Sequence, residues 1–148
     1  MGTGSGEKIS ALPDPPTEHL VVIFPGIHVS TAEAYRSLNL GLTSRTTDLR
    51  IQRFCGLVQS KKMCWTEIFN DFEASILSSY PAIEQAKCYL NDRGAVATLL
   101  SGSGSSVFGF FSDGESAFAA AQESTQAAWR VFPARTLSRA EYFQKMFG

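Results

Sequence analysis

The sequence has few cysteines, no excess of one charge sign and no long apolar run. Its three cysteines, Cys55, Cys64 and Cys88, are odd in number and widely spaced, which predicts neither a disulfide framework nor a zinc site. Lys and Arg number 13 against 14 Asp and Glu, so the net charge is −1. This balance lacks the basic surface that nucleic-acid binding requires. We therefore expect reduced cysteines and no nucleic-acid partner.

Segments that would place the chain in or across a membrane are also missing. The longest apolar stretches, such as residues 20–25 and 107–111, are far too short to cross a bilayer. Residues 1–12 lack the basic start and the apolar run of a signal peptide. The chain is therefore predicted to be cytoplasmic, with no membrane partner.

What is present is the composition of one folded domain. The chain is 44% hydrophobic and 18% charged, values typical of soluble globular proteins. Its 148 residues are enough to build a single core. Residues 1–6 alternate glycine with small polar residues, so we expect residues 1–18 to be a linker or interdomain remnant and residues 19–148 to be the domain.

Apolar periodicity and breaker residues predict a strand, helices, two strands, a helix and a last strand. Ser30 or Thr31 is a natural helix cap, and Pro81 suits the first turn of another helix. The aromatic residues Trp65, Phe69 and Phe72 are expected in the core. This order predicts an α+β, ferredoxin-like βαββαβ fold, with a four-stranded antiparallel sheet, helices on one face and extra helices in the first crossover. The expected elements are strands at 20–24, 95–100, 107–111 and 129–137 and helices at 32–38, 65–77, 81–93 and 115–126.

A loop of small residues lies between the two hairpin strands. Residues 101–106 (SGSGSS) leave little side chain to pack. Glycine permits positive φ and close approach of the backbone to a ligand, and successive amides in such a turn can form a concave anion site. Serine hydroxyls would add donors. The loop predicts a phosphate site, although an ordinary hairpin turn has the same composition. We expect the Gly104→Val change to damage this site more than the stability of the fold.

Several segments together resemble a known family. Residues 100–108 (LSGSGSSVF) resemble the third signature motif of the galactose, homoserine, mevalonate and phosphomevalonate (GHMP) kinase superfamily. Within it, three other stretches are similar to the family of kinases that act on 4-diphosphocytidyl-2-C-methyl-D-erythritol. These stretches are residues 25–35 (PGIHVSTAEAY), 70–73 (NDFE) with 80–83 (YPAI), and 4–9 (GSGEKI). The resemblance extends from near Gly4 to Phe111.

The resemblance implies phosphoryl transfer from ATP, accompanied by Mg²⁺, to the 2-hydroxyl of this substrate in non-mevalonate isoprenoid precursor biosynthesis. The family's longer phosphate loop, of the type PxxxGLGSSxA, is not found in this sequence. The chain also has about half of the implied length. It is therefore expected to be the C-terminal, substrate-binding half, with the N-terminal ATP-binding domain as its missing partner. By itself it is expected to be inactive and to bind neither ATP nor Mg²⁺.

The resemblance also implies which residues contact the substrate, a cytidine diphosphate compound. Tyr35 lies where the family places an aromatic ring against the cytosine, although an aromatic residue at this point of a short helix is commonly part of the core. Thr31, one helical turn earlier, would bind ligand or cap the helix. The loop residues would shape the phosphate-bearing region of the cleft, and they are Ser101, Gly102, Ser103, Gly104 and Ser105. No residue is assigned a catalytic role and none a metal ligand.

Two charged motifs receive a structural interpretation. His28 has no evident carboxylate partner in the sequence and is interpreted as a loop residue. Asp71 and Glu73 stand two residues apart, and such residues do not face each other on a helix. We therefore expect no carboxylate pair here, and we interpret Asp71 as a residue that braces the domain or is solvated.

Two other functions fit the same residues. The predicted architecture hosts many functions, so the chain could be a non-catalytic module that binds an anion or a metabolite. It could also belong to another GHMP-type kinase, with a mevalonate-type or sugar substrate, which would share the loop but have no need of Tyr35. Selective binding of cytidine diphosphate over phosphate distinguishes the first alternative, and the Tyr35→Ala variant distinguishes the second.

Overall fold

A computed structural model describes residues 2–3, 7–14, 16–38, 54–59 and 68–148. The chain divides into two compact units. The first unit comprises residues 1–17, 41–68 and 137–148, and the second comprises residues 18–40 and 69–136. All but the last residue of the expected linker thus belong to a unit that includes two later segments, and the domain boundaries drawn from the sequence stay a prediction.

The first unit contains two short strands and a C-terminal helix that were not predicted from the sequence. Helix α6 begins with a capping box: the Ser138 hydroxyl accepts a hydrogen bond from the Glu141 amide at 3.2 Å, and the Glu141 carboxylate accepts one from the Ser138 amide at 3.0 Å. The spacing of Ser138 and Glu141 is the sequence signal that would have predicted this helix. The described elements of this unit are β1 (Gly2–Thr3) and β2 (Lys8–Ile9), which pair antiparallel, a helical segment at 54–59, and α6 (Arg139–Phe147).

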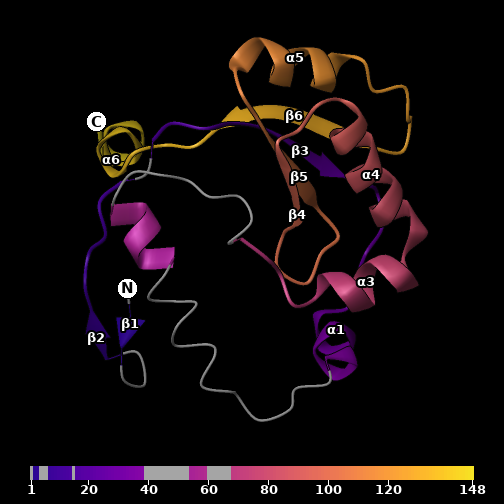
Figure 1. Cartoon of the computed structure of the whole chain (residues 1–148), viewed down its shortest axis with the longest axis horizontal. Coiled ribbons are helices and arrows are strands. Elements are labelled where there is room, and N and C mark those ends of the chain that lie inside the picture. The colour runs from indigo at the N-terminus through magenta and orange to yellow at the C-terminus, as the bar shows by residue number, and fades with distance from the viewer. Residues whose placement is uncertain (1, 4–6, 15, 39–53, 60–67) are drawn as a thin grey trace. The chain divides into compact units, whose positions relative to one another are not determined.

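The second unit is built on a four-stranded antiparallel sheet with the strand order β4-β5-β3-β6 (Figure 1). Both β3 and β4 run antiparallel to β5, which lies between them, so the connection from β3 to β4 is a crossover. This confirms the expected α+β, ferredoxin-like sheet. The strands are β3 (His19–Phe24), β4 (Ala97–Leu100), β5 (Val107–Phe111) and β6 (Arg130–Arg135).

Two helices cover one face of this sheet (Figure 1). Helix α4 (Pro81–Asp92) contacts β4 and β5, and α5 (Gly114–Gln122) contacts β3 and β6. Alternate residues of a strand point to the same face, and Val21 and Ile23 of β3 are fully buried in the core that includes Leu90 of α4 and Ala117 of α5. Apolar residues of the sheet and of both helices therefore form one core between them.

Two shorter helices, α1 (Thr31–Ser37) and α3 (Glu73–Ser79), precede α4. The prediction of helix from residue 68 to 72 is wrong, and residues 65–67 lie outside the described residues. The Asn70 side chain accepts a hydrogen bond from the Phe72 amide at 3.1 Å, a local turn that competes with helix. Consequently Phe69 is 51% exposed rather than part of the core, whereas Phe72 packs against the core as expected.

The side chain of Asp113 caps helix α5. One carboxylate oxygen accepts a hydrogen bond from the Ser116 amide at 2.7 Å, and the other accepts from the hydroxyls of Ser112 and Ser116. These bonds, that of the Ser116 amide above all, hold the pKa of the Asp113 carboxyl below its ordinary 3.8. A lowered folded-state pKa stabilises the fold above the unfolded-state pKa and ceases to do so as the pH falls through the folded-state value.

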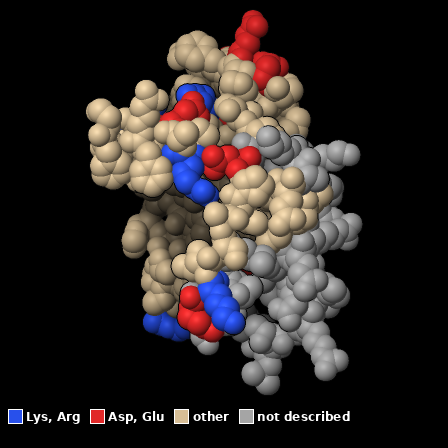
Figure 2. Space-filling model, turned by 90° about the vertical axis from the view of Figure 1, so that its left-hand side faces the viewer, with Lys and Arg blue, Asp and Glu red and all other residues tan. Residues whose placement is uncertain are grey.

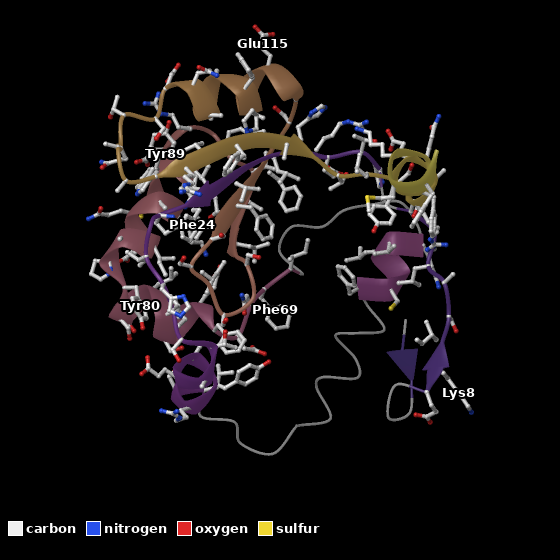
Figure 3. All side chains as sticks on the ribbon, turned by 180° about the vertical axis from the view of Figure 1, so that it is seen from behind. Lys8, Phe24, Phe69, Tyr80, Tyr89 and Glu115 are labelled. Carbon is white, nitrogen blue, oxygen red and sulfur yellow. The ribbon has the colours of Figure 1, made fainter. Side chains whose placement is uncertain are left out.

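We expect the Asp113→Ala variant to melt a few degrees below the wild type at pH 7, because α5 loses its N-cap. The difference should shrink as the pH is lowered below 3.8. Thermal unfolding by circular dichroism at pH 7 and in acid measures both effects. Replacing Glu115 by alanine provides the control. Glu115 points away from the sheet (Figure 3), lies in the same turn of α5 and is not the cap. Equal melting temperatures for the wild type and Asp113→Ala at pH 7 would contradict this account.

The surface shows no area dominated by one charge sign on the face drawn in Figure 2, where Lys and Arg lie interspersed with Asp and Glu among the described residues.

None of the helices in the described ranges is long and apolar enough to cross a membrane. Cys55 is buried and Cys88 is exposed, and Cys64 lies outside the described residues.

Candidate functional site

The glycine loop, residues 101–106, joins β4 to β5 at the end of the sheet where β3 also ends. Ile23 pairs with Val107, and Val107 pairs with Leu100. The ends of β3 and β4 and the beginning of β5 therefore lie at the same edge of the sheet, next to α1 and α3 (Figure 1). Gly102 and Gly104 adopt φ angles of +56° and +95°, in the left-handed region that glycine tolerates. The positive φ expected from this loop is therefore present at both glycines.

The first residue of α1 contacts the glycine loop. The N-cap is Ser30, whose side chain accepts a hydrogen bond from the Glu33 amide at 3.4 Å. This assigns the cap to Ser30 rather than to Thr31. The hydroxyl of Thr31 instead lies 3.1 Å from the hydroxyl of Ser103, in hydrogen-bonding distance. Two predicted site residues, 72 positions apart, are thus brought together.

Internal hydrogen bonds occupy part of the loop. The Gly104 amide donates to the Ser101 carbonyl at 3.0 Å, and the buried hydroxyl of Ser105 donates to the Ile27 carbonyl at 2.6 Å. These two groups hold the loop in shape. The amides of Gly102 and Ser103 donate to no acceptor within the described part of the chain, so they can serve a ligand.

Tyr35 lies four residues after Thr31 and therefore on the same side of α1. Its side chain is 57% exposed, so it is not a core residue. Its ring contacts the ring of Phe72 edge to face, with 5.0 Å between centroids. The contact orients the tyrosine ring and leaves more than half of the side chain available to another molecule.

A cleft of about 350 Å³ opens between the β3–α1 connection and the glycine loop. Phe24, at the end of β3 (Figure 3), Thr31, Gly104 and Ser105 are among its lining residues, whereas Tyr35 is not. His28 is exposed and is the one ionisable side chain among the described lining residues. Its described lining therefore offers backbone and hydroxyl groups and no carboxylate that would repel an anion. In the described ranges, His, Cys, Asp and Glu form no cluster that could hold a metal ion.

Two residues that were not assigned to the site from the sequence form hydrogen bonds with the glycine loop or with Leu100, the residue that precedes it. The Asn70 side chain donates to the carbonyls of Leu100 and Gly102 at 2.8 and 2.7 Å. The Glu73 carboxylate accepts from the Leu100 amide at 2.7 Å. Asp71, the residue expected to brace the domain, is exposed and makes no such contact. The motif at 70–73 was the available signal, but its spacing did not indicate which members reach the loop.

The comparison with protein families decides what kind of domain this is. Residues 61–129 match the family described as GHMP kinases C terminal. The chain contains a GHMP kinase C-terminal domain. This match confirms the resemblance first carried by the loop motif.

Two relatives support the same assignment for this GHMP kinase C-terminal domain. The 4-diphosphocytidyl-2-C-methyl-D-erythritol kinases of Syntrophotalea carbinolica and Solibacter usitatus are 42% and 38% identical to it, over 88% and 80% of this chain. The matched parts make up 45% and 39% of those proteins, so the chain spans less than half of their length.

Two crystal structures share the fold of the GHMP kinase C-terminal domain. A 4-(cytidine 5′-diphospho)-2C-methyl-D-erythritol kinase superposes with a TM-score of 0.66 at 24% identity, over 89% of this chain and 47% of that one. The mevalonate kinase of L. major, in complex with R-mevalonate, gives a TM-score of 0.59 at 12% identity, over 88% and 45% of the two chains. At these identities the likeness concerns the fold alone.

Proposed function

We propose that this GHMP kinase C-terminal domain is the substrate-binding part of a cytoplasmic kinase that transfers a phosphoryl group from ATP to the 2-hydroxyl of 4-diphosphocytidyl-2-C-methyl-D-erythritol. The observation that carries the proposal is the contact between Thr31 and Ser103, which joins the glycine loop to the helix that exposes Tyr35. The names of the relatives support the choice of substrate.

In this proposal, each group of the site binds one part of the substrate. The amides of Gly102 and Ser103 and the nearby hydroxyls hold the diphosphate of the substrate, because backbone amides in a turn bind anions. The ring of Tyr35 stacks on the cytosine, since every base offers an aromatic face. Together these contacts orient the substrate, and positioning is most of what phosphoryl transfer needs from a protein.

ATP would supply the phosphoryl group that is transferred. The described residues suit an anion but not Mg²⁺, because they form no cluster of carboxylates. The Mg²⁺ ligands and the groups that act on the substrate hydroxyl would therefore come from the other part of the enzyme. The isolated chain is accordingly expected to show no turnover.

The test is a two-dimensional amide NMR titration of the chain with cytidine diphosphate, with ATP and inorganic phosphate as comparison ligands. We expect cytidine-selective shifts at residues 31–35 together with shifts at residues 101–105. The Tyr35→Ala variant should bind cytidine diphosphate about 5- to 150-fold more weakly, because stacking is worth about 1–3 kcal/mol per base, while phosphate binding stays unchanged.

Two variants serve as controls for this titration. Tyr35→Phe keeps the ring and should bind like the wild type, and Phe118→Ala removes an exposed aromatic residue of α5 away from the loop. If phosphate alone shifts the loop, a general anion-binding module is supported instead. If Tyr35→Ala binds cytidine diphosphate as well as the wild type does, another GHMP-type substrate is favoured.

A further inference from the structure

The peptide groups at the start of the glycine loop are bound by side chains that precede and begin α3. Leu100, the last residue of β4, donates its amide to Glu73 and offers its carbonyl to Asn70, at 2.7 and 2.8 Å. The same Asn70 nitrogen donates to the Gly102 carbonyl at 2.7 Å. One amide group therefore holds two carbonyls that are two residues apart.

This double contact determines which way the loop amides point. A peptide group is planar and trans in nearly all cases, so its N–H and C=O point in opposite directions. With the Gly102 carbonyl held toward Asn70, the amide of Ser103 is directed away from Asn70. The Leu100 carbonyl is held in the same way, and the following Ser101 amide donates across the loop to the Ser106 carbonyl at 2.9 Å.

The Glu73 carboxylate is itself fixed. Its second oxygen accepts from the Lys87 ammonium group of α4 at 2.6 Å, and both side chains are only about one-fifth exposed, at 21% and 18%. The carboxylate thus links the end of β4 to α4 and keeps the strand end from which the loop leaves in place. Asp71 lies between Asn70 and Glu73 in sequence but is exposed.

We infer that Asn70 is a positioning residue of the anion site: by holding the carbonyls of Leu100 and Gly102, it directs the Ser103 amide toward a phosphate or diphosphate group of the ligand. The part of this inference that concerns ligand binding rests on the proposed function. The part that concerns the loop conformation rests on the hydrogen bonds alone, and the two parts are measured separately.

The decisive variant is Asn70→Asp, in the whole chain. It keeps the size of the side chain and replaces the donor with a carboxylate that repels both carbonyls. We expect the Gly104 amide, which bonds within the loop, to exchange with solvent about tenfold faster, because the loop loses a hydrogen-bond partner. The dissociation constant for cytidine diphosphate should rise by about the same factor. Amides of β5 should exchange as in the wild type.

Asp71→Asn is the matched control, because it makes the reverse chemical change at the neighbouring exposed position and should leave both quantities unchanged. Loss of stability alone lowers the folded fraction and does not alter the affinity of the folded molecules, so the titration separates positioning from folding. If Asn70→Asp does not fold, Asn70→Ala, which removes the donor without adding charge, is measured in the same way.

The outcomes separate this inference from the proposed function. An unchanged Gly104 exchange rate, or faster exchange with unchanged affinity for cytidine diphosphate, overturns the positioning role. If the wild type binds neither cytidine diphosphate nor inorganic phosphate, the proposed function fails. The exchange rates in Asn70→Asp and Asp71→Asn then decide the loop conformation alone, where a difference supports the orienting contact and equality overturns it.

Discussion

The free energy of unfolding of the Gly104→Val variant is expected to be about 2–5 kcal/mol lower than that of the wild type. This loss is the sum of backbone strain and overpacking. Gly104 has a φ of +95°, which a β-branched residue rarely adopts. A Cβ atom at this position would lie 3.3 Å from Leu100 Cδ1 and 3.6 Å from Val29 Cγ2, and both of these side chains are buried. Urea unfolding followed by fluorescence measures the loss.

Gly102→Val is the matched comparison in the same loop. Gly102 also has a positive φ, of +56°, but a Cβ atom there would meet nothing within 4 Å. It should therefore cost only the strain of the left-handed backbone, about 1–2 kcal/mol. Equal losses for the two variants would show that contact with the core contributes nothing. The sequence analysis expected Gly104→Val to damage the site more than the fold, and the buried neighbours indicate that it damages both.

The sheet was predictable because its signals are local. The apolar run before Pro25 and Gly26 predicted β3, and Pro81 marked the start of α4, each within a residue or so of the observed position. Helix α6 also had a local signal, its capping box, which was overlooked. Among the loops, only the glycine loop was identified in advance as a candidate site, because its small residues leave little side chain to pack.

The contacts that shape the site were not predictable in the same way. Asn70 reaches the loop across 32 residues of sequence, through a side chain that bonds to backbone carbonyls. Such a bond leaves no periodicity and requires no particular residue at the accepting position. For the same reason, nothing in the sequence distinguished Ser30 from Thr31 as the cap, or placed Thr31 against Ser103.

The Glu73→Ala variant is expected to lose about 2–4 kcal/mol of unfolding free energy, because it leaves two partly buried donors without their partner. These donors are the Leu100 amide and the Lys87 ammonium group, which Glu73 accepts at 2.7 and 2.6 Å. Lys87→Ala should cost less, about 1–2 kcal/mol, since the carboxylate then keeps its backbone donor. Urea unfolding of both variants measures the difference.

A double-mutant cycle measures the interaction between Glu73 and Lys87. Residues in direct contact do not act additively, so the variant with both changes should lose less than the sum of the two single losses. Glu84→Ala, at an exposed position of α4, is the control and should change the unfolding free energy by less than about 0.5 kcal/mol. If Lys87→Ala proved as costly as Glu73→Ala, the bond to the Leu100 amide would contribute nothing to stability. The carboxylate would then act through its ion pair with α4 alone, and the end of β4 would be held by Asn70.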